Sequence, residues 1–230
     1  MAHQQQQDFL LLVKSKFPSF FAGSRVLEIG SLDINGSIRG HFNGGQYIGL
    51  DVGMGPGVDI VCQGQDYDAP DGSFDVVISC ECFEHNPFWR ETFENMLRLA
   101  RPGGLVVMTC ASTGRAEHGT RRTTPEDAPL IEWDYYRNLE AKDFQTSIAL
   151  SKFLTKARFF TDRSFCDLYF VGFKAGDNLP KNAAAALGQI GFRYLLKNFW
   201  TLSAQMKMRL LIFMVGKERY MQGSLLPWKR

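Results

Sequence analysis

One stretch decides the fold of this chain: Val26-Leu27-Glu28-Ile29-Gly30-Ser31-Leu32-Asp33-Ile34-Asn35-Gly36-Ser37, with Gly49-Leu50-Asp51 a short distance downstream. Its first apolar residues predict a buried strand, and Gly30 lets the backbone of the following turn approach a ligand closely. A second short strand then ends on Asp51, whose carboxylate is suited to the two hydroxyls of a ribose. The stretch therefore predicts a binding site for a nucleoside cofactor.

The hydrophobic pattern around this stretch predicts alternating strands and helices. The predicted strands cover residues 25–30, 47–51, 58–62, 74–80, 105–110, 157–161 and 166–174, and the predicted helices cover residues 5–17, 35–42, 87–100, 143–153 and 180–220. Apolar strands separated by helices form a largely parallel sheet that is covered on both faces. Ligands of such sheets bind at the carboxyl ends of the strands, so we expect the cofactor there.

The composition is that of an ordinary globular protein, but its charge is unevenly distributed. The chain has 230 residues, 45% of them hydrophobic, and a net charge of +2. Residues 181–230 hold nine Lys and Arg and one acidic residue, Glu218, which gives this part +8 and leaves −6 for the rest. An acidic body argues against a protein whose main partner is nucleic acid, whereas the basic end needs another explanation.

The cysteines and the N-terminus indicate a cytoplasmic protein. The five cysteines are odd in number and form no Cys-x-x-Cys pair, which is typical of a reducing compartment. The first residues lack the basic and apolar regions of a secretory signal. No apolar run reaches the ~20 residues that a membrane-spanning helix needs.

Several blocks in a fixed order resemble class I S-adenosylmethionine-dependent methyltransferases of the methyltransferase type 11-like kind. The blocks are Glu-Ile-Gly at 28–30, Gly-Leu-Asp at 49–51, Phe-Asp-Val-Val-Ile-Ser at 74–79, Glu-His at 84–85 and Leu-Ala-Arg-Pro-Gly-Gly at 99–104. The resemblance covers roughly residues 20–175. It implies an α/β fold with a doubly wound, Rossmann-like sheet of seven strands, mostly parallel with an antiparallel last strand.

The resemblance also implies that S-adenosylmethionine lies across the ends of the first four strands. In the family, an Asp after the third strand often accepts the adenine amino group, and Gln63 occupies the aligned position here. The implied cofactor-binding residues are Glu28, Gly30, Ser31, Asp51, Gln63, Gly64 and Ser79. A nicotinamide dinucleotide is disfavoured because its pyrophosphate normally requires a Gly-x-Gly-x-x-Gly turn, which this chain lacks.

The residues after the strand at 74–80 have two functional interpretations. His85 titrates near neutral pH and could act as a base for the methyl acceptor, assisted by Glu81 and Glu84. The spacing Glu81-x-x-Glu84-His85 also resembles the metal-binding motif of ubiquinone-pathway and small-RNA O-methyltransferases, which implies Mg²⁺ or a similar divalent ion with His118 as a fourth ligand. The structural alternative is that His85 merely caps a helix or braces the sheet.

Residues 111–139 form a long segment without a clear period, and a segment of that length is often a functional loop. Its arginines are suited to a phosphate or carboxylate of the substrate, and its tyrosines to stacking on a sugar or ring. The candidate substrate residues are Arg115, His118, Arg121, Tyr135 and Tyr136. A solvated loop with two packing tyrosines is the alternative.

We expect two parts: a methyltransferase domain at residues 1–178 and a basic, apolar, helical C-terminal extension at residues 179–230. The extension alternates apolar blocks with Lys and Arg. It is interpreted either as a lid or homodimer surface packed against the core, or as an amphipathic helix in peripheral contact with an anionic membrane.

The function that these patterns favour is O-methylation of a small molecule or a saccharide. Oxygen is preferred because the Glu and His cluster suits hydroxyl activation, and because the Asn/Asp-Pro-Pro-Tyr/Phe motif of amino-group methyltransferases is missing. Two alternatives stay open. One is a metal-dependent RNA 2′-O-methyltransferase, against which the acidic body argues, and the other is a non-catalytic binding protein with the same fold.

Overall fold

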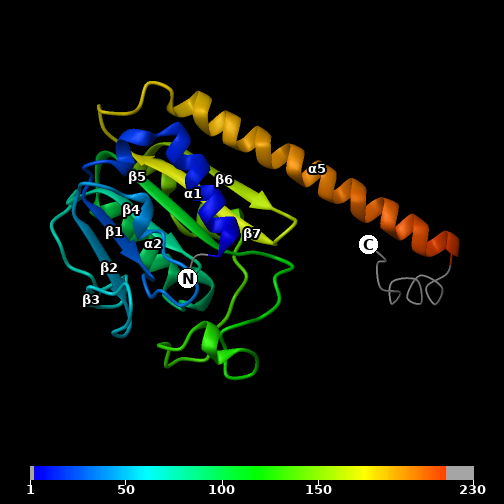
Figure 1. The fold of residues 1–230 in the computed structure, drawn as a ribbon. Helices are drawn as coiled ribbons and strands as arrows, with labels where there is room; N and C mark the ends of the chain where they lie inside the picture. The colour runs from blue at the N-terminus through cyan, green and yellow to red at the C-terminus, as the bar shows by residue number, and fades with distance from the viewer. Residues whose placement is uncertain (1–2, 216–230) are drawn as a thin grey trace.

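The computed structural model describes residues 3–215, which form one seven-stranded sheet with helices on both faces (Figure 1). The strands are β1 (Val26–Ile29), β2 (Tyr47–Asp51), β3 (Ile60–Val61), β4 (Phe74–Cys80), β5 (Ala100–Ala111), β6 (Leu154–Asp162) and β7 (Asp167–Lys174). The α-helices are α1 (Gln4–Lys16), α2 (Trp89–Leu99), α3 (Ala141–Ser147), α4 (Leu150–Phe153) and α5 (Ala183–Val215).

The strand order is β3-β2-β1-β4-β5-β7-β6. All neighbours pair in parallel except β7, which runs antiparallel to both β5 and β6. The chain order reverses between β1 and β4, so their carboxyl ends form the crevice in which such sheets bind ligands. The predicted doubly wound, Rossmann-like fold with an antiparallel last strand is confirmed.

Two hydrophobic clusters cover the two faces of the sheet. On one face, Phe9, Leu10 and Val13 of α1 pack against strands β4, β5 and β7, together with the first turns of α5. On the other face, Phe93 and Met96 of α2 pack with α3 against the opposite side of the same strands. Strands β4, β5 and β7 therefore bury both faces, which explains their continuous runs of apolar residues.

The prediction of a helix at residues 35–42 is wrong, because the chain between β1 and β2 contains only the short 3-10 helix η2 (Arg39–His41). The carboxylate of Asp33 accepts the backbone N–H of Gly36 at 2.9 Å, which fixes a turn. Gly36 itself has φ of 143°, a value that lies outside the helical region. Competing local bonds therefore break the helical pattern at its first residues.

Strands β2 and β4 have the predicted bounds, whereas several other elements differ in theirs. The third strand is two residues long instead of residues 58–62, and the helix at 143–153 is divided into α3 and α4. The predicted C-terminal helix is one helix, α5, as far as residue 215, and its predicted continuation to residue 220 lies outside the described residues. Among the described residues, no helix is long and apolar enough to cross a membrane.

Candidate functional site

Gly30 ends β1 at the crevice and takes a conformation that only glycine adopts easily. Its φ is 81°, and a Cβ atom at this position would lie 2.6 Å from Cβ of Cys82. The backbone N–H groups of Gly30 and Ser31 both donate to the carbonyl oxygen of Leu50 at 2.9 Å. The turn after β1 is thus held tightly against the end of β2.

Asp51 ends β2 beside this turn. Its Oδ2 accepts the N–H of Leu32 at 2.9 Å, and its Oδ1 accepts the N–H of Val52 at 2.8 Å. A carboxylate oxygen has two lone pairs, so each oxygen keeps one for a further donor. The two backbone bonds fix the carboxylate in an orientation from which it can accept a pair of neighbouring hydroxyls.

Gly30 and Asp51 line a cleft together with Cys82, His85 and Ile131. The cleft consists of two cavities of ≈ 40 Å³ and ≈ 50 Å³ that share these five residues. The first cavity continues to Gln63, Gly64 and Trp133, and the second to Leu32, Glu81 and Leu130. The long segment between β5 and α3 therefore forms the outer wall of the crevice.

The predicted adenine-binding residues lie in the first cavity. The amide oxygen of Gln63 accepts the side-chain N–H of Gln65 at 2.6 Å, so it is partly engaged within the protein. Gly64 lies tightly against α2, because a Cβ atom there would come within 2.8 Å of Ile29 and Thr92. Its carbonyl oxygen accepts the amide of Asn95 at 2.8 Å.

The other three predicted cofactor residues lie behind the cleft and do not line it. Glu28 is buried, and its Oε2 accepts the hydroxyl of Tyr47 at 2.7 Å. Ser79 is buried and donates to the carbonyl oxygen of Ile29 at 2.7 Å, which ties β4 to β1. Ser31 is buried with its hydroxyl close to Gly49. These residues support the crevice from within the protein.

The chain turns sharply where it leaves β4. Glu81 has φ of 52°, in the left-handed region that few residues other than glycine adopt. The following 3-10 helix η3 (Phe83–His85) is buried throughout. This turn carries Glu84 and His85 back beneath the long loop instead of into solvent.

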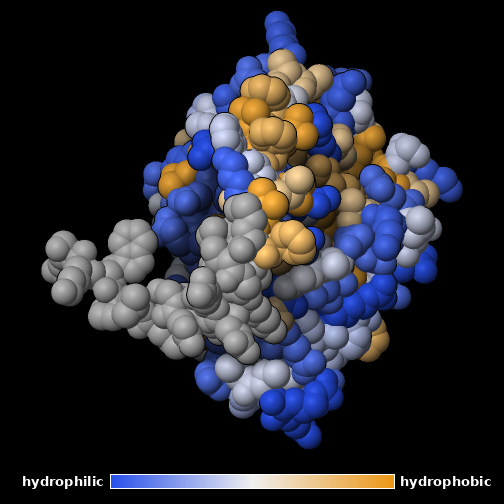
Figure 2. Space-filling model, turned by 90° about the vertical axis from the view of Figure 1, so that its right-hand side faces the viewer, coloured by the Kyte–Doolittle hydropathy of each residue, from blue (hydrophilic) through white to orange (hydrophobic). Residues whose placement is uncertain are grey.

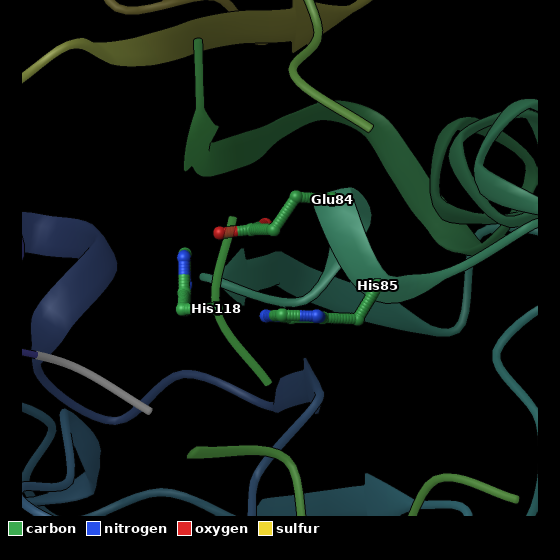
Figure 3. Close-up of side chains that lie close together, drawn as sticks. All are labelled: Glu84, His85 and His118. Carbon is green, nitrogen blue, oxygen red and sulfur yellow. The ribbon is translucent and has the colours of Figure 1, made fainter. Parts of the chain in front are cut away.

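Glu84, His85 and His118 form a compact cluster (Figure 3). One ligand atom of each lies within 4.8 Å of the others, with Glu84 and His85 coming from η3 and His118 from the long loop. Oε1 of Glu84 accepts the N–H of Ala111 at 3.1 Å, whereas its Oε2 is buried without a hydrogen-bond partner. Both ring nitrogens of His85 are also buried and unpartnered.

The geometry of His118 assigns its proton. Nδ1 lies 3.1 Å from the carbonyl oxygen of Ala116, which can only accept, so in the neutral ring Nδ1 carries the hydrogen and Nε2 keeps the lone pair. A second group that orients an imidazole in this way is typical of metal-binding histidines. The cluster thus offers a carboxylate oxygen and imidazole lone pairs, which are donors that a divalent cation accepts.

Burial shifts the protonation of the cluster toward its uncharged forms. Burial and the neighbouring His118 lower the pKa of His85 to about 4. Burial and the charge of Glu81 raise the pKa of Glu84 well above its usual value. The ring of Tyr136 closes the cluster, with its centroid 5.5 Å from that of His85 and 5.0 Å from that of His118.

Glu81, which the sequence grouped with these ligands, belongs to a second cluster. Its Oε2 lies 3.4 Å from Nε2 of His3 and 4.0 Å from the guanidinium of Arg115. The same Arg115 forms an ion pair with Asp167 at 3.0 Å. Although burial opposes its ionisation, His3 and Arg115 lower the pKa of Glu81. Glu81 therefore faces His3 and Arg115, although its Oε2 accepts no hydrogen bond.

The predicted substrate residues are divided between these places. His118 and Tyr136 lie at the first cluster, and Arg115 lies in the second. Arg121 braces the long loop itself, since its side chain donates to the carbonyl oxygen of Glu132 at 3.1 Å. Tyr135 is half-buried and is not among the residues that line the two cavities of the cleft.

Sequence reasoning missed four residues at the crevice: His3, Cys82, Trp133 and Asp167. The indole N–H of Trp133 donates to the carbonyl oxygen of His85 at 2.7 Å, which fastens the long loop over the cleft. Aromatic residues in an aperiodic segment were a signal for Trp133. His3 and Asp167 meet Glu81 only through the packing of α1 and β7, which no local pattern reveals.

Comparison with known proteins identifies the fold family. The family model described as methyltransferase domain matches residues 1–168. No curated protein sequence matches the chain.

Two solved structures illustrate the likeness in fold. The first is the Haemonchus contortus phosphoethanolamine N-methyltransferase 2 in complex with S-adenosyl-L-methionine, with 17% identity and a TM-score of 0.52 over 74% of this chain and 52% of that one. This chain thus spans about half the length of that enzyme. The second is the [4+2]-cyclase SpnF, with 15% identity and a TM-score of 0.52 over 77% of this chain and 85% of that one.

Proposed function

Because this chain belongs to the methyltransferase domain family, we propose that it transfers the methyl group of S-adenosylmethionine to an oxygen atom of a small molecule or a saccharide. The observation that carries this proposal is the position of the Glu84, His85 and His118 cluster. It lies beside the end of β4, and His85 also lines the cleft that contains Gly30 and Asp51. Cofactor-binding and acceptor-activating groups therefore share one cleft.

The cofactor would be held by the carboxyl ends of β1 and β2. Asp51 keeps a free lone pair on each oxygen and is fixed by two backbone bonds, which suits the ribose hydroxyls. Once the loop wall opens, the turn at Gly30 would receive the methionine part, and the first cavity, with Gln63 and Gly64, would receive the adenine. Glu28 and Ser79 act behind the cleft by fixing the ends of the strands that carry these residues.

The acceptor side suits a hydroxyl better than an amine. Methyl transfer is an in-line displacement at the sulfonium methyl, and an alcohol must lose its proton as the new bond forms. Glu84 and His85 present buried, unpartnered acceptor atoms, and His118 presents a lone pair on Nε2. The residues fit a divalent cation, which would acidify and orient the acceptor oxygen when bound.

The donor set refines the choice of metal. One carboxylate with two imidazoles favours a transition ion such as Mn²⁺, Fe²⁺ or Zn²⁺ over Mg²⁺, which prefers oxygen ligands. Glu81 is not part of this donor set, because it lies with His3 and Asp167 in the second cluster and faces Arg115.

A small acceptor is supported by the covered crevice. The loop residues Leu130, Ile131 and Trp133 wall the cleft, and Tyr136 presents an aromatic ring beside His85. An aromatic ring next to an activating cluster suits stacking on a sugar or phenol ring. Such a wall leaves little access for a folded RNA.

The test measures cofactor binding and turnover separately. Titration calorimetry with S-adenosylhomocysteine examines the cofactor site, and transfer of labelled methyl groups to a panel of sugars and phenols examines the reaction. We expect binding without metal, turnover that EDTA abolishes, and recovery with Mn²⁺ or another transition ion. Glu84→Gln should lose turnover and keep cofactor binding, whereas Glu94→Gln, at a half-buried glutamate of α2 that lies outside the cleft, should keep both.

Other results would reject parts of the proposal. Absence of binding to S-adenosylhomocysteine would remove the cofactor. Turnover that is insensitive to EDTA would remove the metal and leave His85 as a base. Binding of S-adenosylhomocysteine without methyl transfer to any acceptor would favour a protein that uses this fold for another function, since one fold serves many functions.

A further inference from the structure

Helix α5 has two apolar sides, and only one of them is covered. Residues of its first turns, including Ala186, Leu187 and Ile190, are buried against α1, β6 and β7. Further along, Lys197 forms an ion pair with Asp162 at 2.6 Å, and Asn198 donates to the carbonyl oxygen of Thr161. These contacts fix one side of the helix along β6, while the helix continues past the sheet (Figure 1).

The opposite side of α5 is an exposed apolar stripe. We use the name apolar stripe for Phe192, Leu195, Leu196, Phe199, Met206, Leu210 and Phe213. Their spacing of three, four or seven residues places them on one face of a helix. Their exposed fractions run from 43% for Leu196 to 86% for Phe213. Figure 2, viewed from the side toward which α5 projects, shows hydrophobic side chains gathered in a continuous column.

The charges on α5 all have the same sign. The helix contains Arg193, Lys197, Lys207 and Arg209 and no acidic residue. Lys197 is neutralised by Asp162, but Lys207 and Arg209 lie beyond the part of the helix that these bonds fix. At helical spacing they flank the apolar stripe on its two sides. An apolar stripe bordered by cations is suited to a surface that is apolar inside and anionic outside.

We propose that the apolar stripe of α5 binds an anionic lipid surface, with the helix lying in the plane of the headgroups. Phe and Leu side chains would enter the acyl boundary, and Lys207 and Arg209 would contact lipid phosphates, as in interfacial amphipathic helices. This inference does not depend on the methyltransferase activity, since the stripe lies on the side of α5 that faces away from the sheet.

The charge pattern favours lipid over a second copy of the chain. A pair of α5 helices joined through the apolar stripe would bring cations together and would have no acidic side chain of α5 to offset them. Arg209 lies seven residues after Leu202 and would border the seam, where like charges repel each other. An anionic surface instead neutralises Lys207 and Arg209 and buries the same aromatic side chains.

The experiment is co-sedimentation of the full-length protein with vesicles of phosphatidylcholine, with and without phosphatidylglycerol. We expect binding to the anionic vesicles that weakens with added salt, and much weaker binding to the neutral ones. Phe213→Glu should weaken binding by about tenfold or more, since it replaces a side chain inserted into the lipid by a charged one. Leu11→Glu, at an exposed apolar position of α1, is the matched control and should bind as the parent does.

Two double variants that change the net charge of the protein by the same amount test the role of the cations on α5. Lys207→Glu with Arg209→Glu should abolish the preference for anionic vesicles, whereas Lys152→Glu with Lys156→Glu, at exposed positions next to or in β6, should retain it. Equal binding to neutral and anionic vesicles, or equal loss in both pairs, would overturn the proposal. Sedimentation equilibrium that shows a stable dimer, converted to monomer by Phe213→Glu, would overturn it in favour of a second copy.

Discussion

Gly30 combines two requirements that can be separated by mutation. Gly30→Ala introduces both a strained backbone, with φ of 81°, and a Cβ atom 2.6 Å from Cys82. Gly23 has a similar φ of 70° but open space around its Cα. We expect Gly23→Ala to cost about 1 kcal/mol of unfolding free energy and Gly30→Ala to cost at least ~2 kcal/mol, measured by urea denaturation. Equal losses of unfolding free energy in the two variants would mean that the side chain of Cys82 moves aside at little cost.

Asp51 should contribute to cofactor affinity more than to folding. Asp51→Asn keeps one oxygen that accepts a backbone N–H but removes the charge and half of the acceptor capacity for two hydroxyls. We expect S-adenosylhomocysteine to bind more weakly by about 1–3 kcal/mol, measured by calorimetry. The control is Asp33→Asn, at a carboxylate that only caps the turn at Gly36. Unchanged affinity of the Asp51 variant would place the ribose elsewhere.

Glu28 should make the stability of the fold depend on pH. Burial raises the pKa of Glu28 from 4.5 to about 7 in the folded protein, although the hydrogen bond from Tyr47 acts to lower it. Between these two values the unfolded chain releases the proton while the folded chain keeps it, so the free energy of unfolding falls as pH rises. Glu28→Gln should remove the part of this fall that Glu28 contributes, and should be more stable than the parent above pH 7 by up to about 3 kcal/mol.

The comparison for Glu28 is urea denaturation of both proteins across this pH range. Well below pH 4.5 Glu28 is protonated in both the folded and the unfolded chain, so the free energies of unfolding of the two proteins should differ little there. A Glu28→Gln protein whose advantage is constant with pH would show that the carboxyl group titrates normally in the fold.

At the scale of elements, the segment from Leu130 to Trp133 must move for the cofactor to enter. The two cavities beside it measure ≈ 40 Å³ and ≈ 50 Å³, whereas pockets for ligands of this size measure about 300–1,000 Å³. The hydrogen bond from Trp133 to the carbonyl oxygen of His85 holds the segment down. Trp133→Phe should therefore raise the association rate constant of S-adenosylhomocysteine, measured by stopped-flow fluorescence.

Hydrogen exchange supplies an independent measure of the same movement. Amides of residues 127–133 should change their exchange rates when S-adenosylhomocysteine binds, while those of β5 should not. If neither the association rate nor this exchange changes, the wall of the cleft is already open in solution.

The sequence predicted best those elements whose pattern is continuous. The bounds of β4 are those predicted, because seven residues that end at Cys80 are almost all buried and leave no competing period. The helix at residues 35–42 failed since a single Asp side chain, Asp33, reorganises the turn before it. The third strand was overestimated because a strand at the edge of the sheet pairs on one side only.

The same distinction holds for the candidate site: residues that follow from a local pattern were predicted, and residues that meet only through tertiary packing were not. Glu84 and His85 follow a predictable strand end, and the loop that supplies His118 was recognised from its composition. The removal of Glu81 from the cluster was unpredictable, because it depends on His3 and Asp167, which are distant in sequence and adjacent only after α1 and β7 pack. Ion pairs of this kind depend on tertiary structure, and no short-range spacing encodes them.

At the scale of the whole molecule, the division predicted at residues 1–178 and 179–230 stays a prediction, and the packing of α5 supplies a second candidate boundary inside the helix. The first turns of α5 belong to the same hydrophobic cluster as α1, and the ring of Tyr194 lies 5.3 Å from that of Tyr169 in β7. The later part of α5 carries the exposed apolar stripe. We therefore predict a boundary within the helix, close to Gln205, which still lines a cavity with β6.

Two truncations test this boundary. A chain that ends at Gln205 should keep its thermal midpoint and its affinity for S-adenosylhomocysteine, because it retains the buried side of α5 and the bonds of Lys197 and Asn198. A chain that ends at Asn178 exposes the cluster around Phe9 and Tyr169 and loses Leu187 and Ile190 from it. It should lose at least about 3 kcal/mol of unfolding free energy, which few domains can spare. Thermal denaturation of both chains measures this difference. Equal midpoints of the two truncated chains would support the division at residue 178. A lower midpoint of the longer chain than of the full-length protein would show that the exposed part of α5 also stabilises the fold.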